Sequence, residues 1–125
     1  MKNEHDLVEE IRQKRGYVYP WQEYLAREDP TFVEAYERMW DTIGARSVVL
    51  DEKTKQLILI AVVCSRLDDV AMRTQIARGL RLGLTPTEIY EAIEVAFLPS
   101  GALTLVHGIK ALVDQLPTEE SSASL

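Results

Sequence analysis

The sequence predicts an all-α protein, a helical bundle organised around a central helical hairpin at residues 51–82. Apolar side chains recur at three- and four-residue spacing in several separate segments, which is the period of an amphipathic helix. Helix-start signals with proline at the first helical position occur at Asp29-Pro30 and at Thr85-Pro86. No segment alternates polar and apolar residues long enough for a strand, and the sequence contains no internal repeat.

The first 44 residues carry the signals of three helices. Leu7, Val8 and Ile11 lie at helical spacing within residues 4–15, and Gly16 ends that helix. Residues 21–27 are long enough for one or two helical turns. The next predicted helix follows Asp29 and ends at Gly44. Its predicted buried face consists of Phe32, Val33, Tyr36, Met39, Trp40 and Ile43.

The central hairpin follows in residues 51–82. Asp51 is a suitable N-cap, and the run QLILIAVV at residues 56–63 is apolar on nearly every side. A helix without a polar stripe must be covered all round, and a chain of 125 residues has little material for this. We therefore expect a second subunit to cover part of it. The hairpin turns near Ser65-Arg66, and Gly83 closes its second helix.

Two further helices complete the predicted bundle. Thr85 and Glu88 form a capping box, and the sequence Pro-Ser-Gly at residues 99–101 breaks the helix that follows. The apolar stripe of that helix consists of Ile89, Ala92, Ile93, Ala96 and Phe97. A last helix at residues 102–116 precedes Pro117. We therefore expect three parts: an N-terminal helical extension at residues 1–28, a main domain at 29–117 and a disordered tail at 118–125.

The composition is that of a globular protein, with 46% hydrophobic and 27% charged residues. The net charge is −6 and the basic residues are interleaved with acids, which argues against nucleic acid as a partner. The N-terminus lacks the apolar segment of a secretory signal, and the apolar run at 57–64 is far shorter than the ~20 residues of a membrane span. We expect no membrane association and, from the single cysteine, a cytoplasmic location.

Two segments, DEKTKQLILIAVVC at residues 51–64 and IARGLRLGLTPTEIYEAIEVAFLPSGALTLVHGIKAL at residues 76–112, are informative together. They resemble the carboxymuconolactone decarboxylase family, which includes the alkylhydroperoxidase D-like proteins. The resemblance covers about residues 30–115 and is most specific in GLTPTEIYEA and in the small-residue helix after Ser100-Gly101. It implies an all-α bundle with a central helical hairpin that assembles into homodimers, homotrimers or homohexamers.

The peroxidase-like branch of that family uses a Cys-x-x-Cys pair on the hairpin together with a histidine and a glutamate. The corresponding positions in this chain are occupied by Asp68, Ala71, Gln75 and Gln56. None of the four matches, so this site has neither a thiol to attack a peroxide nor an imidazole to transfer a proton. The departure argues strongly against disulfide-based peroxidase activity.

The decarboxylase branch, which the sequence also resembles, acts on small anionic lactone acids and needs no cysteine. Loss of carbon dioxide beside a carbonyl requires a cation for the carboxylate, a donor for the developing enolate and an acid to protonate carbon. The candidates are Arg66, Arg73 and Gln75 for substrate binding, and Asp68, Asp69 and His107 for catalysis. The alternatives are an exposed salt bridge between Asp69 and Arg73, and a histidine packed within an apolar helix.

The sole cysteine, Cys64, lies on the apolar helix, where a small buried hydrophobe is the alternative to a reactive thiol. His5 and His107 have no metal-ligand spacing, so we expect neither a metal nor a cofactor. Three functions stay open. The first is a lyase acting on a small carboxylic acid or lactone, the second a non-catalytic oligomeric binding or scaffold protein, and the third a redox protein that uses Cys64 between subunits.

Overall fold

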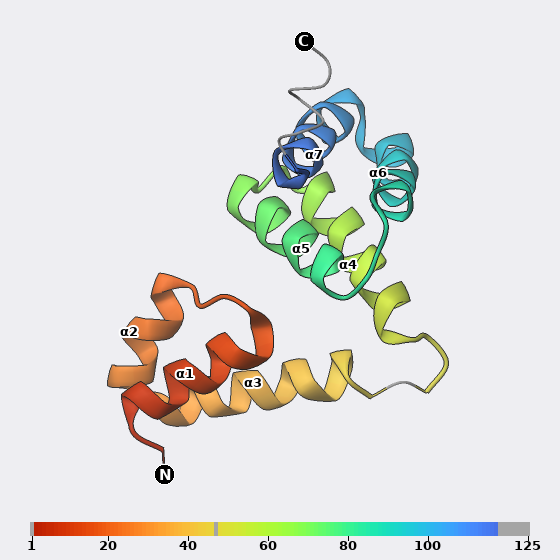
Figure 1. Ribbon diagram of the computed structural model, residues 1–125. Helices are drawn as coiled ribbons and strands as arrows, with labels where there is room; N and C mark the ends of the chain where they lie inside the picture. Colours follow the sequence, from red (N-terminus) through yellow and green to blue (C-terminus); the bar gives the residue numbers. More distant parts are fainter. Residues whose placement is uncertain (1, 47, 118–125) are drawn as a thin grey trace. The chain divides into compact units, whose positions relative to one another are not determined.

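The computed structural model describes residues 2–46 and 48–117, and this part of the chain consists of seven helices joined by short loops (Figure 1). No strand occurs in these residues, which confirms the predicted all-α class. Within the same ranges, no helix combines the length and apolar character needed to cross a bilayer. The predicted tail at residues 118–125 lies outside the described residues.

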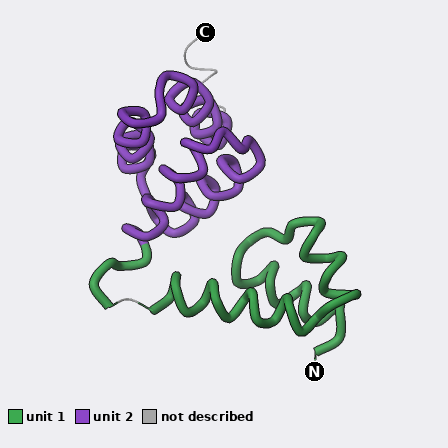
Figure 2. The backbone as a smooth tube through the Cα atoms, turned by 180° about the vertical axis from the view of Figure 1, so that it is seen from behind, with its two compact units in different colours: residues 1–52 green, residues 53–125 purple. Residues whose placement is uncertain are grey.

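The chain divides into two compact units, Met1–Glu52 and Lys53–Leu125 (Figure 2). The first unit contains three helices, α1 (Glu4–Arg15), α2 (Pro20–Glu28) and α3 (Pro30–Gly44). The second contains nearly all of α4 (Glu52–Ser65), together with α5 (Asp69–Arg81), α6 (Pro86–Ser100) and α7 (Ala102–Gln115). The division falls inside the predicted main domain because α3 shares an apolar core with α1 and α2.

In the first unit, α1 ends and α3 begins at signals predicted from the sequence, whereas the N-cap of α1 was not predicted. The Asn3 side chain accepts a hydrogen bond from the backbone N–H of Asp6, and Gly16 ends α1 in the left-handed conformation at φ 84°. Asp29 caps α3 by accepting a hydrogen bond from Phe32 N. The three helices enclose a small apolar core formed by Leu7, Ile11, Ala26 and Val33.

Helix α3 does not bury the face that its apolar pattern predicts. Val33 is fully buried, but Phe32, Met39 and Ile43 are 48%, 49% and 60% exposed. The prediction of a buried stripe is therefore wrong for these three residues. The reason is Glu37, which is buried on the inner face of the helix and turns the stripe outward.

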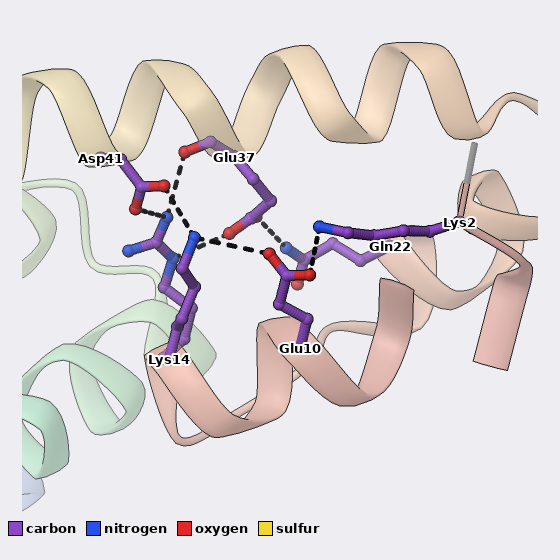
Figure 3. A network of polar contacts seen from close by, with 7 residues as sticks. Lys2, Glu10, Lys14, Gln22, Glu37 and Asp41 are labelled. Carbon is purple, nitrogen blue, oxygen red and sulfur yellow. Dashed lines mark hydrogen bonds and ion pairs between the residues drawn. The ribbon is translucent and has the colours of Figure 1, made fainter. Parts of the chain in front are cut away.

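A buried network of charged side chains accounts for the position of Glu37. Arg15 Nε donates to Glu37 Oε1 at 2.9 Å, and Arg15 Nη2 donates to Asp41 Oδ1 at 2.9 Å. Gln22 Nε2 donates to Glu37 Oε2 at 3.0 Å, so α1, α2 and α3 all contribute to the network. Figure 3 shows the side chains of Gln22, Glu37, Lys14 and Asp41 directed into this region, with Lys14 Nζ 2.8 Å from Asp41 Oδ2.

The second unit contains the predicted helical hairpin, formed by α4 and α5, and α6 and α7 pack with it around one core (Figure 1). Helix α4 buries Gln56, Ile60 and Cys64, whereas Ile58 and Val62 on another face are 50% and 45% exposed. The unit therefore covers the apolar helix on one side only. The buried core consists of Ile60, Cys64, Met72, Ile76, Leu84, Ile89, Ile93, Ala111 and Leu112.

The ends of the helices in this unit follow the predicted signals closely. Gly83, at φ 95°, reverses the chain after α5. Thr85 and Glu88 form the predicted capping box, in which Thr85 Oγ1 accepts from Glu88 N at 3.0 Å and Glu88 Oε1 accepts from Thr85 N at 2.8 Å. Helix α6 continues through Pro99, which lies in its last turn, and it ends where Gly101 takes φ 95°.

Candidate functional site

The hairpin holds a cluster of three polar side chains, the buried Gln56 from α4 with the buried Gln75 and the partly buried Arg78 from α5, which we call the amide cluster. Gln56 and Gln75 are 1% and 4% exposed. Gln56 Nε2 donates to the backbone oxygen of Gln75 at 2.9 Å and to Gln75 Oε1 at 3.1 Å. Arg78 Nη1 donates to Gln56 Oε1. These contacts connect α4 to α5 in the middle of an apolar hairpin.

The amide cluster combines one basic side chain with two neutral amides. Its two amides do not titrate, and its guanidinium is charged at every physiological pH. Because Gln56 Oε1 accepts from Arg78, the amide group of Gln56 is oriented with its N–H donors toward Gln75. The cluster thus combines one partly buried cation with two neutral amides, and a guanidinium is the side-chain group that pairs best with a carboxylate.

A second polar group, the ion network, lies on the outer side of the hairpin between α5 and α7. Arg73 Nε is 3.1 Å from Asp69 Oδ1, and Arg73 Nη1 is 2.8 Å from Asp114 Oδ2. Lys110 Nζ also pairs with Asp114 at 3.0 Å, and Lys110 and Arg73 together lower the pKa of that carboxyl. His107 is exposed and precedes Lys110 by three residues, so the two share a face of α7.

The corner between α4 and α5 holds two further candidates in structural roles. Asp68 Oδ1 accepts from Ala71 N at 3.1 Å and so caps α5. Leu67 takes a left-handed conformation at φ 59°, which reverses the chain between the helices. Arg66 is exposed at the same corner. The geometry of the corner is therefore that of an ordinary helix cap and turn.

His107 is remote from the amide cluster within one copy of the chain. Its neighbour Gly108 packs against α4, where a Cβ atom on the glycine would lie 3.2 Å from Cys64 Sγ. Cys64 follows Gln56 by eight residues, which is a rise of about 12 Å along α4. This separation along α4 argues against joint action of His107 and the amide cluster on one small substrate bound to one copy.

The structure thus does not bring the predicted candidates together at one place. It brings Asp69 and Arg73 together in the ion network, and it places Gln75 on the opposite, buried side of α5. The sequence reasoning missed Arg78 and treated Gln56 only as a replaced family position. Two signals were available: Gln56 is the one polar residue in the run at 56–63, and Arg78 follows Gln75 by three residues on the same helix.

Cys64 is fully buried, and burial raises the pKa of its thiol to about 11. At pH 8 we expect iodoacetamide to label the folded protein about a hundredfold more slowly than the unfolded protein, because the thiolate is scarcer by that factor. The thiol of the unfolded chain ionises at a lower pH than the buried thiol. The contribution of Cys64 to the free energy of unfolding should therefore be full below about pH 9 and be lost as the pH rises to about 11. Equal labelling rates in buffer and in denaturant would contradict this burial.

Metal-ligating groups are sparse in the described ranges. No group of three or more His, Cys, Asp or Glu side chains among residues 2–46 and 48–117 is arranged to hold a metal ion. The ion network contains two carboxylates, but each pairs with cations. The hairpin's own polar groups are the guanidinium of Arg78 and the amides of the two glutamines.

Comparisons with known proteins agree with the family resemblance seen in the sequence. A sequence model of the carboxymuconolactone decarboxylase family matches residues 30–114. The chain is 39% identical over 84 residues to uncharacterized protein MJ0742 of Methanocaldococcus jannaschii, covering 66% of this chain and 80% of that protein. It is 26% identical over 92 residues to uncharacterized protein MJ1511 of the same organism, covering 74% and 85%.

A solved structure extends the comparison to the fold. The crystal structure of a proposed carboxymuconolactone decarboxylase from Burkholderia xenovorans LB400 superposes with a TM-score of 0.77 over 98% of both chains, at 22% identity. At that identity the likeness shows a shared fold. Because the family model spans more than half of the chain and a 39% identical relative is matched over 80% of its length, the protein belongs to the carboxymuconolactone decarboxylase family.

Proposed function

We propose that the protein is a lyase acting on a small carboxylic acid or lactone, with the substrate carboxylate held at the amide cluster. The observation that supports the proposal is the contact of Arg78 with the buried Gln56–Gln75 pair. A carboxylate beside Arg78 gains charge-assisted hydrogen bonds in surroundings of low dielectric, where such bonds are strong. The family name suggests a carboxymuconolactone as the substrate to test.

Decarboxylation at this site would depend on electrostatic stabilisation. The bond between the carboxylate carbon and the adjacent ring carbon breaks, carbon dioxide leaves, and the bonding electrons move into an enolate. Arg78 orients the carboxylate, and Gln75 Nε2 is the proposed donor to the developing enolate oxygen, since Gln56 Nε2 already donates to Gln75 O and Oε1. Solvent water supplies the proton to carbon, since Gln56 and Gln75 do not titrate. In this proposal Asp68, Asp69 and His107 act outside the reacting centre.

The test is a turnover assay with carboxymuconolactone that follows release of carbon dioxide. The wild-type protein should release carbon dioxide, and Gln75→Leu should lower the rate about 10²-fold or more because a donor to the oxyanion is lost. Arg73→Ala and His107→Ala should leave the rate nearly unchanged. No turnover by the wild type would remove the lyase proposal, and loss of activity in His107→Ala alone would move the chemistry to α7.

A non-catalytic oligomeric binding or scaffold protein is the second candidate. It is favoured by the corner, where Asp68 caps α5 and Asp69 pairs with Arg73 as such residues do in ordinary helices. Both candidates share a homo-oligomer, which the exposed apolar side chains of α4 favour, and a cytoplasmic location, which the lone cysteine suits. A redox role for Cys64 is disfavoured by the raised pKa of its buried thiol.

A further inference from the structure

The second unit exposes two apolar surfaces on different helices. The first, the α4 ridge, consists of Ile58 and Val62 with Arg66 one turn further on, and these residues follow one another at intervals of four. The backbone N–H of Arg66 donates to Val62 O, so the helical path continues to the arginine. The ridge is thus an apolar strip with a cation at its C-terminal end.

The second surface, the α6 groove, is an open depression of about 690 Å³ beside α6. Val95 and Leu98, which both line this groove, are 65% and 78% exposed. Glu91 and Glu94 line the same groove. These acids would repel a carboxylate, so the groove does not suit the substrate proposed above.

We infer that the α4 ridge of one copy packs antiparallel against the α6 groove of a second copy. The inference rests on the homo-oligomer of the proposed function and names its surface. In the antiparallel direction, Ile58 meets Leu98, Val62 meets Val95, and Arg66 meets Glu91. Arg66 follows Ile58 by eight positions, a rise of about 12 Å, and Leu98 follows Glu91 by seven positions, a rise of about 10.5 Å, so the two strips match in length.

Charge and symmetry support a second copy of the chain as the partner that packs on the α6 groove. The cation of the ridge falls opposite an acid of the groove, which fixes the direction of the two helices. Antiparallel helices also place opposite ends of their dipoles together. Because ridge and groove are different surfaces, each copy offers both, and every copy in a closed assembly buries two apolar strips. This covers the side of α4 that its own unit leaves exposed.

Leu98→Glu in the full-length protein tests the surface. The side chain is 78% exposed, so the folded copy should be unaffected while light scattering after gel filtration shows a shift to smaller species. Val113→Glu, at a 53% exposed position on α7, is the matched control and should leave the assembly intact. A monomeric wild type at micromolar concentration would overturn both the oligomer and the surface. Unchanged assembly of Leu98→Glu would overturn the surface alone.

A charge exchange tests the direction of packing. Arg66→Glu and Glu91→Arg should each weaken the assembly at least about tenfold, because each places like charges together. The double variant should recover most of the lost affinity, since it restores an opposite-charge pair. Recovery supports the antiparallel register. Two single variants that weaken the assembly without any recovery in the double variant would overturn it.

Discussion

Replacement of Arg15 by methionine is expected to lower the free energy of unfolding of the first unit by about 3–5 kcal/mol. Arg15 and Glu37 are both buried, and the guanidinium holds Glu37 and Asp41 at 2.9 Å each. Burial disfavours the charge of Asp41, but Lys14 and Arg15 outweigh it and lower the pKa of that carboxyl. Without Arg15, the carboxylate of Glu37 stays buried and keeps the hydrogen bond from Gln22 of α2.

Fluorescence measures this change selectively, because both tryptophans of the chain, Trp21 and Trp40, lie in the first unit. Denaturant titrations followed by tryptophan emission therefore report that unit alone. Arg27→Met is the matched control: its ion pair with Glu28 is exposed, and its loss should cost less than about 1 kcal/mol. Similar effects of the two variants would contradict a buried network that holds the three helices together.

Replacement of Gln56 by leucine is expected to destabilise the second unit by about 1–3 kcal/mol. The change removes the acceptor of Arg78 Nη1 and the donor to Gln75, while it keeps the size and helix propensity of the side chain. The gain in apolar burial does not compensate for desolvating a guanidinium that has lost a partner.

The second unit contains no tryptophan, so its stability is not followed by tryptophan fluorescence. Hydrogen exchange measured on peptides of α4 and α5 reports the loss instead. Gln13→Leu, at an exposed position of α1, is the control and should change stability by less than about 0.5 kcal/mol. Protection of α4 and α5 equal to that of the wild type would mean that the amide cluster contributes nothing to the hairpin.

The sequence predicted the helices well because their ends depend on local chemistry. Gly16, Asp29, Gly83 and the capping box at Thr85 act through neighbouring backbone groups, and each terminates or begins a helix where expected. The hairpin could also be predicted from the sequence, since its two apolar segments are separated by a short polar turn. These features need no knowledge of distant contacts.

The faces of the helices and the site depended on such contacts and were predicted less well. The outward stripe of α3 follows from Arg15, which lies 22 residues from Glu37 and draws that side chain inward. Likewise, Arg78 reaches Gln56 across 22 residues, so its role was invisible in the local pattern of α5. Periodicity shows which residues share a face, and long-range polar pairs decide which face is buried.

The most direct test of the amide cluster is a calorimetric titration of the full-length protein with carboxymuconolactone. The wild type should bind, Arg78→Met should lose affinity by at least about thirtyfold because a charged partner is removed, and Arg73→Met should bind as the wild type does. Both arginines lie on α5, on its inner and outer sides. Loss of binding in Arg73→Met with retention in Arg78→Met, or no binding by the wild type, would contradict a carboxylate site at the amide cluster.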